Sequence, residues 1–154
     1  MKIDLRVPAR PRAWLWILNA LRTINAELIA GTASFPLLYY SPVVYRRESV
    51  ERFATADQCL ALGEEDCDSL SAWRAGELEA LGWLAVFPFE DAHQWAAYYR
   101  PATIPARVVL TQEGPTAYHA LVAYEIEGQT FYDDPSARLG MYGAVTPEIQ
   151  ELRP

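Results

Sequence analysis

The chain of 154 residues is 51% hydrophobic and 21% charged, with a formal net charge of -7. This length and composition predict one globular domain and exclude a disordered chain. The acidic balance disfavours nucleic acid and membranes as partners, because their phosphates repel a negatively charged surface. Two cysteines, Cys59 and Cys67, are too few for a disulfide framework. The apolar run 13–18 is too short for the core of a signal peptide, and no stretch approaches a membrane span of roughly 18 apolar residues.

The first part of the chain predicts an arm, a helix and a loop. Residues 1–11 are expected to form an extended arm, and residues 32–50 a loop. Between them a helix is predicted over 12–30, ending at Gly31. Its apolar stripe consists of Trp14, Ile17, Leu18, Leu21, Ile24 and Leu28. This stripe is expected to pack on the core, the alternative being a helix that docks on a partner.

Two further helices are predicted before the strand-like segments begin. A short helix is expected over 55–62, capped by Thr55. The acidic run 64–66 is expected to be a solvated loop. A longer helix then runs from about Cys67 to Leu81, with Asp66 as its N-cap, so that Cys67 lies in the first helical turn.

Strands follow the helices, which predicts an α+β fold rather than alternating β-α-β units. A short strand is expected over 83–89 and a helix or turn over 93–99. Segments rich in Val, Ile, Tyr and Phe predict strands over 107–110, 117–126 and 129–132.

The last two strands are predicted to form a hairpin with a two-residue turn at 127–128. In that register Leu121 lies opposite Asp134, and His119 shares a face with Leu121 because side chains alternate along a strand. Asp134 is therefore expected beside His119. Asp133 is expected on the other face, solvated or capping the next turn, whereas a three-residue loop would exchange the two aspartates.

Cys67, His119 and Asp134 form the chain order nucleophile, base and orienting carboxylate that a thiol site requires. A helix N-terminus favours a thiolate, but the carboxylates of Asp66 and Asp68 disfavour it. His119 must therefore approach Cys67 for the thiol to act as a nucleophile.

Each of these residues also fits a structural role when taken alone. A cysteine in a helix is commonly a small core residue, and aspartates before a proline commonly form a turn. Zinc binding by Cys59, Cys67, His93 and His119 is disfavoured, because no pair has the close spacing of structural zinc sites. We expect no metal and no cofactor.

Three segments carry a family resemblance: Asp66–Leu78, Tyr118–Val122 and Asp133–Met141, with 38–41 and 45–48 fitting the same pattern. Together they resemble the transglutaminase-like, papain-fold proteins that tailed bacteriophages and prophages encode, over roughly residues 35–141. The resemblance implies a papain-like or transglutaminase-like fold in which the cysteine helix packs on a small antiparallel sheet. Residues 35–154 would form this domain, with the arm and helix of 1–34 added to it in one compact unit.

The resemblance also assigns the site, with Cys67 as nucleophile, His119 as base and Asp134 as orienting carboxylate. The backbone N–H of Cys67, with Gln58 or Tyr45, is the candidate oxyanion donor. Two positions depart from the family pattern. They are Glu65, where the family tends to have glycine, and Ser69, where it often has an acidic residue.

The implied function is acyl transfer or amide hydrolysis on a protein or peptide substrate, by a virion-associated protein of the virion or bacterial cytoplasm. The alternative is a catalytically inactive head–tail or tail assembly protein that retains the fold and contacts other virion proteins. Neither function involves nucleic acid or a membrane.

Overall fold

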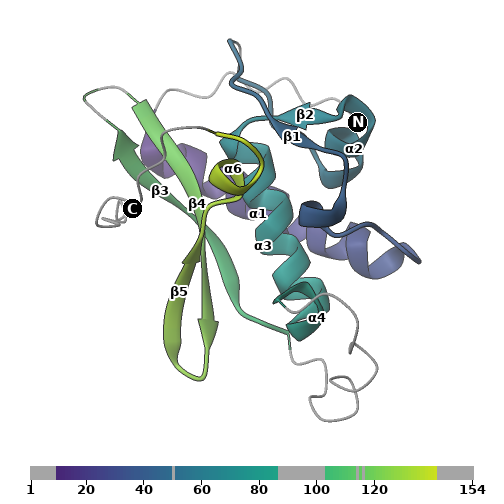
Figure 1. Cartoon of the computed structure of the whole chain (residues 1–154). Helices are drawn as coiled ribbons and strands as arrows, with labels where there is room; N and C mark the ends of the chain where they lie inside the picture. The colour runs from purple at the N-terminus through teal and green to yellow at the C-terminus, as the bar shows by residue number, and fades with distance from the viewer. Residues whose placement is uncertain (1–9, 50, 87–102, 114, 116, 142–154) are drawn as a thin grey trace.

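A computed structural model describes residues 10–49, 51–86, 103–113, 115 and 117–141, and it combines helices with two small sheets (Figure 1). The elements in chain order are α1 (Pro11–Gly31), η1 (Leu38–Tyr40), β1 (Val44–Tyr45), α2 (Ala56–Leu62), β2 (Glu64–Glu65), α3 (Cys67–Leu81), α4 (Trp83–Val86), β3 (Ala106–Glu113), β4 (Ala117–Ile126), β5 (Gln129–Asp133) and α6 (Pro135–Arg138). Strands β3, β4 and β5 form an antiparallel sheet in that order, and β1 pairs with β2 in parallel. This is the expected mixture of helices and a small antiparallel sheet. Within the described residues, no helix has the length and apolar character to cross a membrane.

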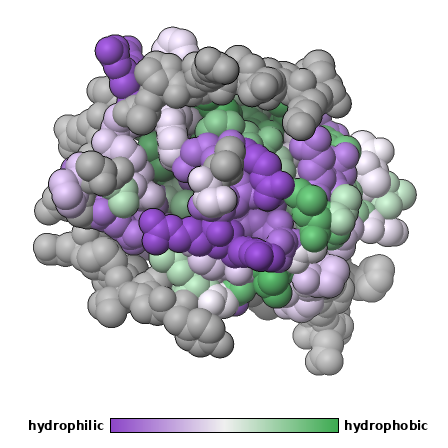
Figure 2. All heavy atoms as spheres, turned by 90° about the horizontal axis from the view of Figure 1, so that it is seen from above, coloured by the Kyte–Doolittle hydropathy of each residue, from purple (hydrophilic) through white to green (hydrophobic). Residues whose placement is uncertain are grey.

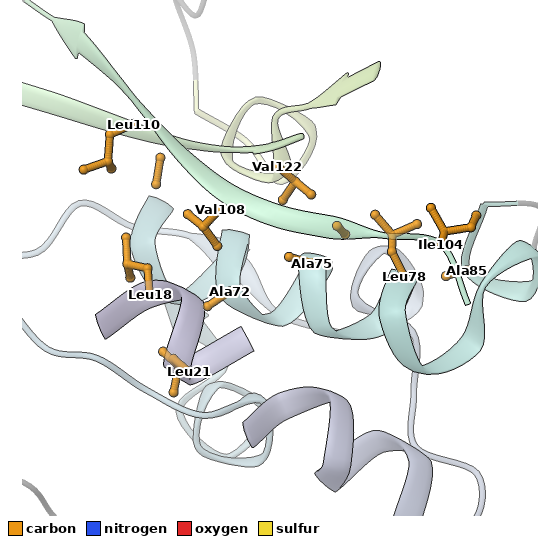
Figure 3. Close-up of a cluster of buried hydrophobic side chains, with 12 residues drawn as sticks. Leu18, Leu21, Ala72, Ala75, Leu78, Ala85, Ile104, Val108, Leu110 and Val122 are labelled. Atoms are coloured by element: carbon orange, nitrogen blue, oxygen red, sulfur yellow. The ribbon is translucent and has the colours of Figure 1, made fainter. Parts of the chain in front are cut away.

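Helix α3 is the centre of the fold, and its residues 68–78 are buried. One side of α3 packs on α1 and the other on β3 and β4 (Figure 3). Small side chains at Ala72 and Ala75 let these layers approach, and Leu18 of α1 and Val108 of β3 fill the space beside them. Helix α3 is therefore covered on both sides.

The contact between α1 and α3 is closest at Gly76. A Cβ atom at Gly76 would lie 2.7 Å from the carbonyl oxygen of Arg22 and 2.8 Å from Cβ of Asn25. Neither neighbour is the flexible end of a side chain, so the two helices would have to separate to accept any larger residue.

Replacing Gly76 by alanine is expected to lower the free energy of unfolding by about 2 kcal/mol, because overpacking outweighs the better helix propensity of alanine. Urea unfolding followed by circular dichroism measures the change. Gly31→Ala is the control, since a Cβ there meets nothing within 4 Å. Equal stability of the two variants would contradict the close packing described for α1 and α3.

Polar side chains of α1 join it to the other elements. Asn19 donates from Nδ2 to the carbonyl of Val108 (3.1 Å) and accepts at Oδ1 from the N–H of Val108 (3.0 Å). Asn25 is fully buried and accepts from the N–H of Ala56. Ile24 of the predicted apolar stripe is instead 50% exposed, because the buried face of α1 turns toward Asn25. Because Asn25 is polar, a pattern of apolar residues alone does not predict this buried face correctly.

The hairpin of β4 and β5 has the predicted two-residue turn. Ile126 pairs with Gln129, and Val122 pairs with Asp133. Glu127 and Gly128 both have positive φ, at 50° and 78°, as a tight turn of two left-handed residues requires. The register used to place Asp134 beside His119 is thereby confirmed.

Other expectations need correction. The strand expected over 83–89 is wrong for Trp83–Val86, which form helix α4 after the backbone turns at Gly82. The loop expected over 32–50 contains η1 and strand β1, whose partner β2 lies in the acidic run. The remainder of 83–89, the segment 93–99 and most of the arm over 1–11 lie outside the described residues.

Candidate active site

Cys67 is the first residue of α3 and lies against β4. The side chain of Asp66 caps the helix by accepting from the N–H of Asp68 at 3.2 Å. The backbone of Ala120 lowers the pKa of Cys67 against larger effects that raise it, and one turn later Ser71 Oγ donates to the Ala120 carbonyl at 3.0 Å. The thiol is therefore held beside the residue that follows His119. In Figure 1 this end of α3 lies at the top, so Figure 2 looks onto it from above and shows hydrophilic residues gathered in the middle of the face.

His119 and Asp134 are joined directly. His119 Nε2 lies 2.9 Å from Asp134 Oδ2, and His119 is only 5% exposed. The second carboxylate oxygen, Oδ1, accepts from the N–H of Ala137 at 3.1 Å and so caps α6. An aspartate has no proton to donate when ionised, so Nε2 carries the hydrogen and Nδ1 of the neutral ring keeps its lone pair.

The charges of this pair support one another. Burial opposes protonation of His119, but the hydrogen bond and charge of Asp134 outweigh it, and the pKa of His119 is raised. Burial alone would raise the pKa of Asp134, but the hydrogen bonds from His119 and Ala137 lower it. The charge of Asp68, in the first turn of α3, also raises the pKa of His119.

The acidic run next to Cys67 is buried, contrary to the expectation of a solvated loop. Glu65 is 1% exposed and Asp66 8%, because β2 pairs with β1 and draws the run into the fold. Glu64 alone matches the expectation, since its half-exposed carboxylate binds Arg46.

Burial of these carboxyl groups moves their protonation toward neutral pH. Burial and the charges of Asp68 and Glu48 raise the pKa of Asp66 to about 8. Burial raises the pKa of Asp68 to about 6. The neighbouring Glu51 is exposed, and its partial burial with the charge of Asp68 raises its pKa to about 7. Part of the cluster is therefore protonated at pH 7.

Cys67 is a protonated thiol in this setting. Its Sγ donates to Asp68 Oδ1 at 3.4 Å. Burial and the charges of Asp68 and Asp66 raise the pKa of Cys67 well above the ordinary range of a thiol. Forming a thiolate therefore requires that the proton be taken up nearby or that these carboxylates be neutralised.

The expectation that Asp133 is solvated or caps the next turn is wrong. Its Oδ2 lies 2.9 Å from Nε of Arg74 on α3, and its side chain is 10% exposed. The expectation fails because β5 places Asp133 on the face of the sheet that covers α3, where Arg74 is buried at 4% exposure. Arg74 lies inside the segment Asp66–Leu78, where the sequence assigns it no role of its own, although an arginine within an otherwise buried helix is a detectable signal.

The remaining candidates have structural partners. Gln58 accepts from the N–H of Thr55 and closes the start of α2, and Cys59 is fully buried with its Sγ 3.8 Å from the Ala54 carbonyl. The backbone N–H of Tyr45 donates to the Leu139 carbonyl at 3.0 Å, and burial raises the pKa of its side chain. Ser69 accepts from the N–H of Ala54, which explains a small polar residue there.

Among the described residues, no group of three or more His, Cys, Asp or Glu side chains could hold a metal ion. His93, a member of the disfavoured zinc set, lies outside them. Comparison of the chain with protein-family models, curated proteins and solved structures finds no match.

Proposed function

We propose that this protein is a thiol-dependent acyltransferase or amide hydrolase with a transglutaminase-like, papain-like fold, encoded by a tailed phage or prophage and associated with the virion. The observation that carries the proposal is the 2.9 Å contact between His119 Nε2 and Asp134 Oδ2. His119 lies on β4 and Asp134 caps α6, and both of these elements pack on the helix that begins at Cys67. The phage setting and the family rest on the resemblance of the three sequence segments.

In the proposed reaction Nδ1 of His119 takes the proton of Cys67, and the sulfur forms a bond to the carbonyl carbon of a protein or peptide amide. The imidazolium then gives its proton to the leaving amine as the C–N bond breaks. Water or a second amine attacks the thioester, and its proton returns through His119 as the thiol leaves. Asp134 keeps the imidazole in the required tautomer and stabilises its protonated form.

The second candidate is an inactive structural or assembly protein of the virion that retains the fold. The burial of Glu65, Asp66 and Asp68 around the thiol favours it, because a neutral thiol is a poor nucleophile. The two candidates differ in whether His119 changes the reactivity of Cys67.

For the active site, limiting iodoacetamide at pH 7 is expected to label Cys67 faster than the buried Cys59, as measured by mass spectrometry. His119→Gln should slow the labelling of Cys67, because the imidazole no longer accepts its proton. Asp68→Asn should speed it roughly tenfold, because one adjacent negative charge is removed. Equal labelling of both cysteines, or a rate that ignores His119→Gln, would favour the structural protein.

A further inference from the structure

Arg74 connects the helix that carries Cys67 to the strand that leads to Asp134. Its Nε donates to Asp133 Oδ2 at 2.9 Å, and its Nη1 donates to Glu77 Oε2 at 2.5 Å and to the Ala85 carbonyl at 2.8 Å. One buried guanidinium thus bonds to β5, α3 and α4 at once. Lysine has no planar fork that could reproduce these directions.

A second cation and an aromatic ring complete this group. The guanidinium of Arg74 lies 4.7 Å from the centre of the Tyr39 ring, and that of Arg138 lies 4.5 Å from it. Arg138 Nη1 is also 3.8 Å from Asp133 Oδ1, but its side chain is 60% exposed. The buried contact to Asp133 therefore comes from Arg74 and the exposed one from Arg138.

The contact between Arg74 and Asp133 bears on the candidate site because Asp133 directly precedes Asp134 in the chain. Successive side chains at a strand end point to opposite faces. Asp133 points to α3 and Arg74, while Asp134 points to His119. Fixing Asp133 therefore limits where the backbone of Asp134 lies.

We propose that Arg74, acting through Asp133, is a positioning residue that holds the Asp134 carboxylate against His119. A buried ion pair adds little net stability, because desolvation offsets its attraction, so its fixed geometry is the more important contribution. The inference rests on the proposed function, since the position of Asp134 matters for chemistry only if His119 acts on Cys67.

The rival explanation is that Asp134 holds itself in place. Its Oδ1 caps α6 by accepting from Ala137, and Pro135 restricts the backbone immediately after it. If this cap were sufficient, the Arg74–Asp133 pair would be structural only.

The test is the tautomer and pKa of His119, read by NMR from its imidazole ¹⁵N shifts in the full chain, with His93→Gln in every sample to leave one histidine. Arg74→Lys keeps the charge but loses the fork, and Asp133→Ala removes the acceptor while Arg74 keeps Glu77. Both variants are expected to convert neutral His119 from the Nε2–H form to a mixture of tautomers. The pKa of His119 should fall by about half a unit or more, toward the ordinary value of about 6.5.

Two further variants serve as controls, one expected to lose the tautomer preference and one expected to keep it. Asp134→Asn should abolish the Nε2–H preference, whereas Arg138→Gln, which removes only the exposed cation at Asp133, should leave the wild-type tautomer. Folding is checked by a cooperative thermal transition, and if Arg74→Lys does not fold, Asp133→Ala decides alone. An unchanged tautomer in the folded Arg74→Lys and Asp133→Ala proteins overturns the inference in favour of the α6 cap. The NMR spectra do not depend on catalysis. If Cys67 proved unreactive, the proposed function would be contradicted, but the effect of Arg74 and Asp133 on His119 could still be measured.

Discussion

Asp134→Asn is expected to lower the rate of acyl transfer by about 10²- to 10⁴-fold on any amide substrate that the protein turns over. The reason lies in the two duties of this carboxylate. One oxygen accepts from Ala137 and the other faces His119 Nε2. An asparagine has a single oxygen, and if it keeps the cap on α6 its NH₂ group must face Nε2. The imidazole would then carry its proton on Nδ1, the nitrogen needed to accept the proton of Cys67.

Substrate turnover under single-turnover conditions gives the rate, and the pH profile gives the pKa of the base. Asp57→Asn is the matched control, because Asp57 is an exposed aspartate in the first turn of another helix, α2. If Asp134→Asn retained the wild-type rate while the control also did so, Asp134 would have no role in orienting the base.

The protein is also expected to lose stability as the pH rises from 5 to 8, on the order of 3 kcal/mol. Asp66 and Asp68 have folded-state pKa values of about 8 and about 6, whereas in the unfolded chain both ionise near pH 4. The folded state therefore binds more protons than the unfolded state in this window. The stabilisation is fully present below about pH 4 and is lost as the pH passes through the folded-state values.

Urea unfolding at a series of pH values measures this slope. His119, whose pKa is also raised, contributes in the same direction, so the difference between variants isolates the carboxyl group. Asp66→Asn should flatten the curve while retaining the helix cap, since asparagine is an equally good N-cap. Asp57→Asn, at an exposed aspartate of α2, is the matched control. Stability that rises between pH 5 and 8 in the wild-type protein would show that the cluster is not buried in solution.

Local sequence patterns predict the parts of this fold that local physics determines. The helix of Cys67 begins at its capping aspartate and ends before Gly82, and the β4–β5 register follows from a two-residue turn that needs positive φ. The contact between His119 and Asp134 is predictable for the same reason, because pleat and register alone put both on one face.

The features that the sequence does not predict depend on distant segments. The β1–β2 pairing joins strands of two residues, too short for an alternating pattern, and the two glutamates of β2 carry no strand signal. The burial of Glu65 follows from this pairing. The Arg74–Asp133 pair requires knowing that the last residue of β5 lies beside the middle of α3. Arg74 and Asp133 are residue types that are mostly exposed to solvent, so only the assembled structure identifies them as partners.

The side-chain amide of Asn19 has a consequence for how this protein behaves among its own copies. Strand β3 lies at the margin of its sheet, where free N–H and C=O groups invite a strand from another molecule. Asn19 supplies the donor and the acceptor that such a strand would offer to Val108, and Arg22 covers the Ala106 carbonyl at 2.6 Å. Side chains of α1 thus take the hydrogen-bonding positions of a neighbouring strand along part of β3, which protects this edge of the sheet against edge-to-edge aggregation.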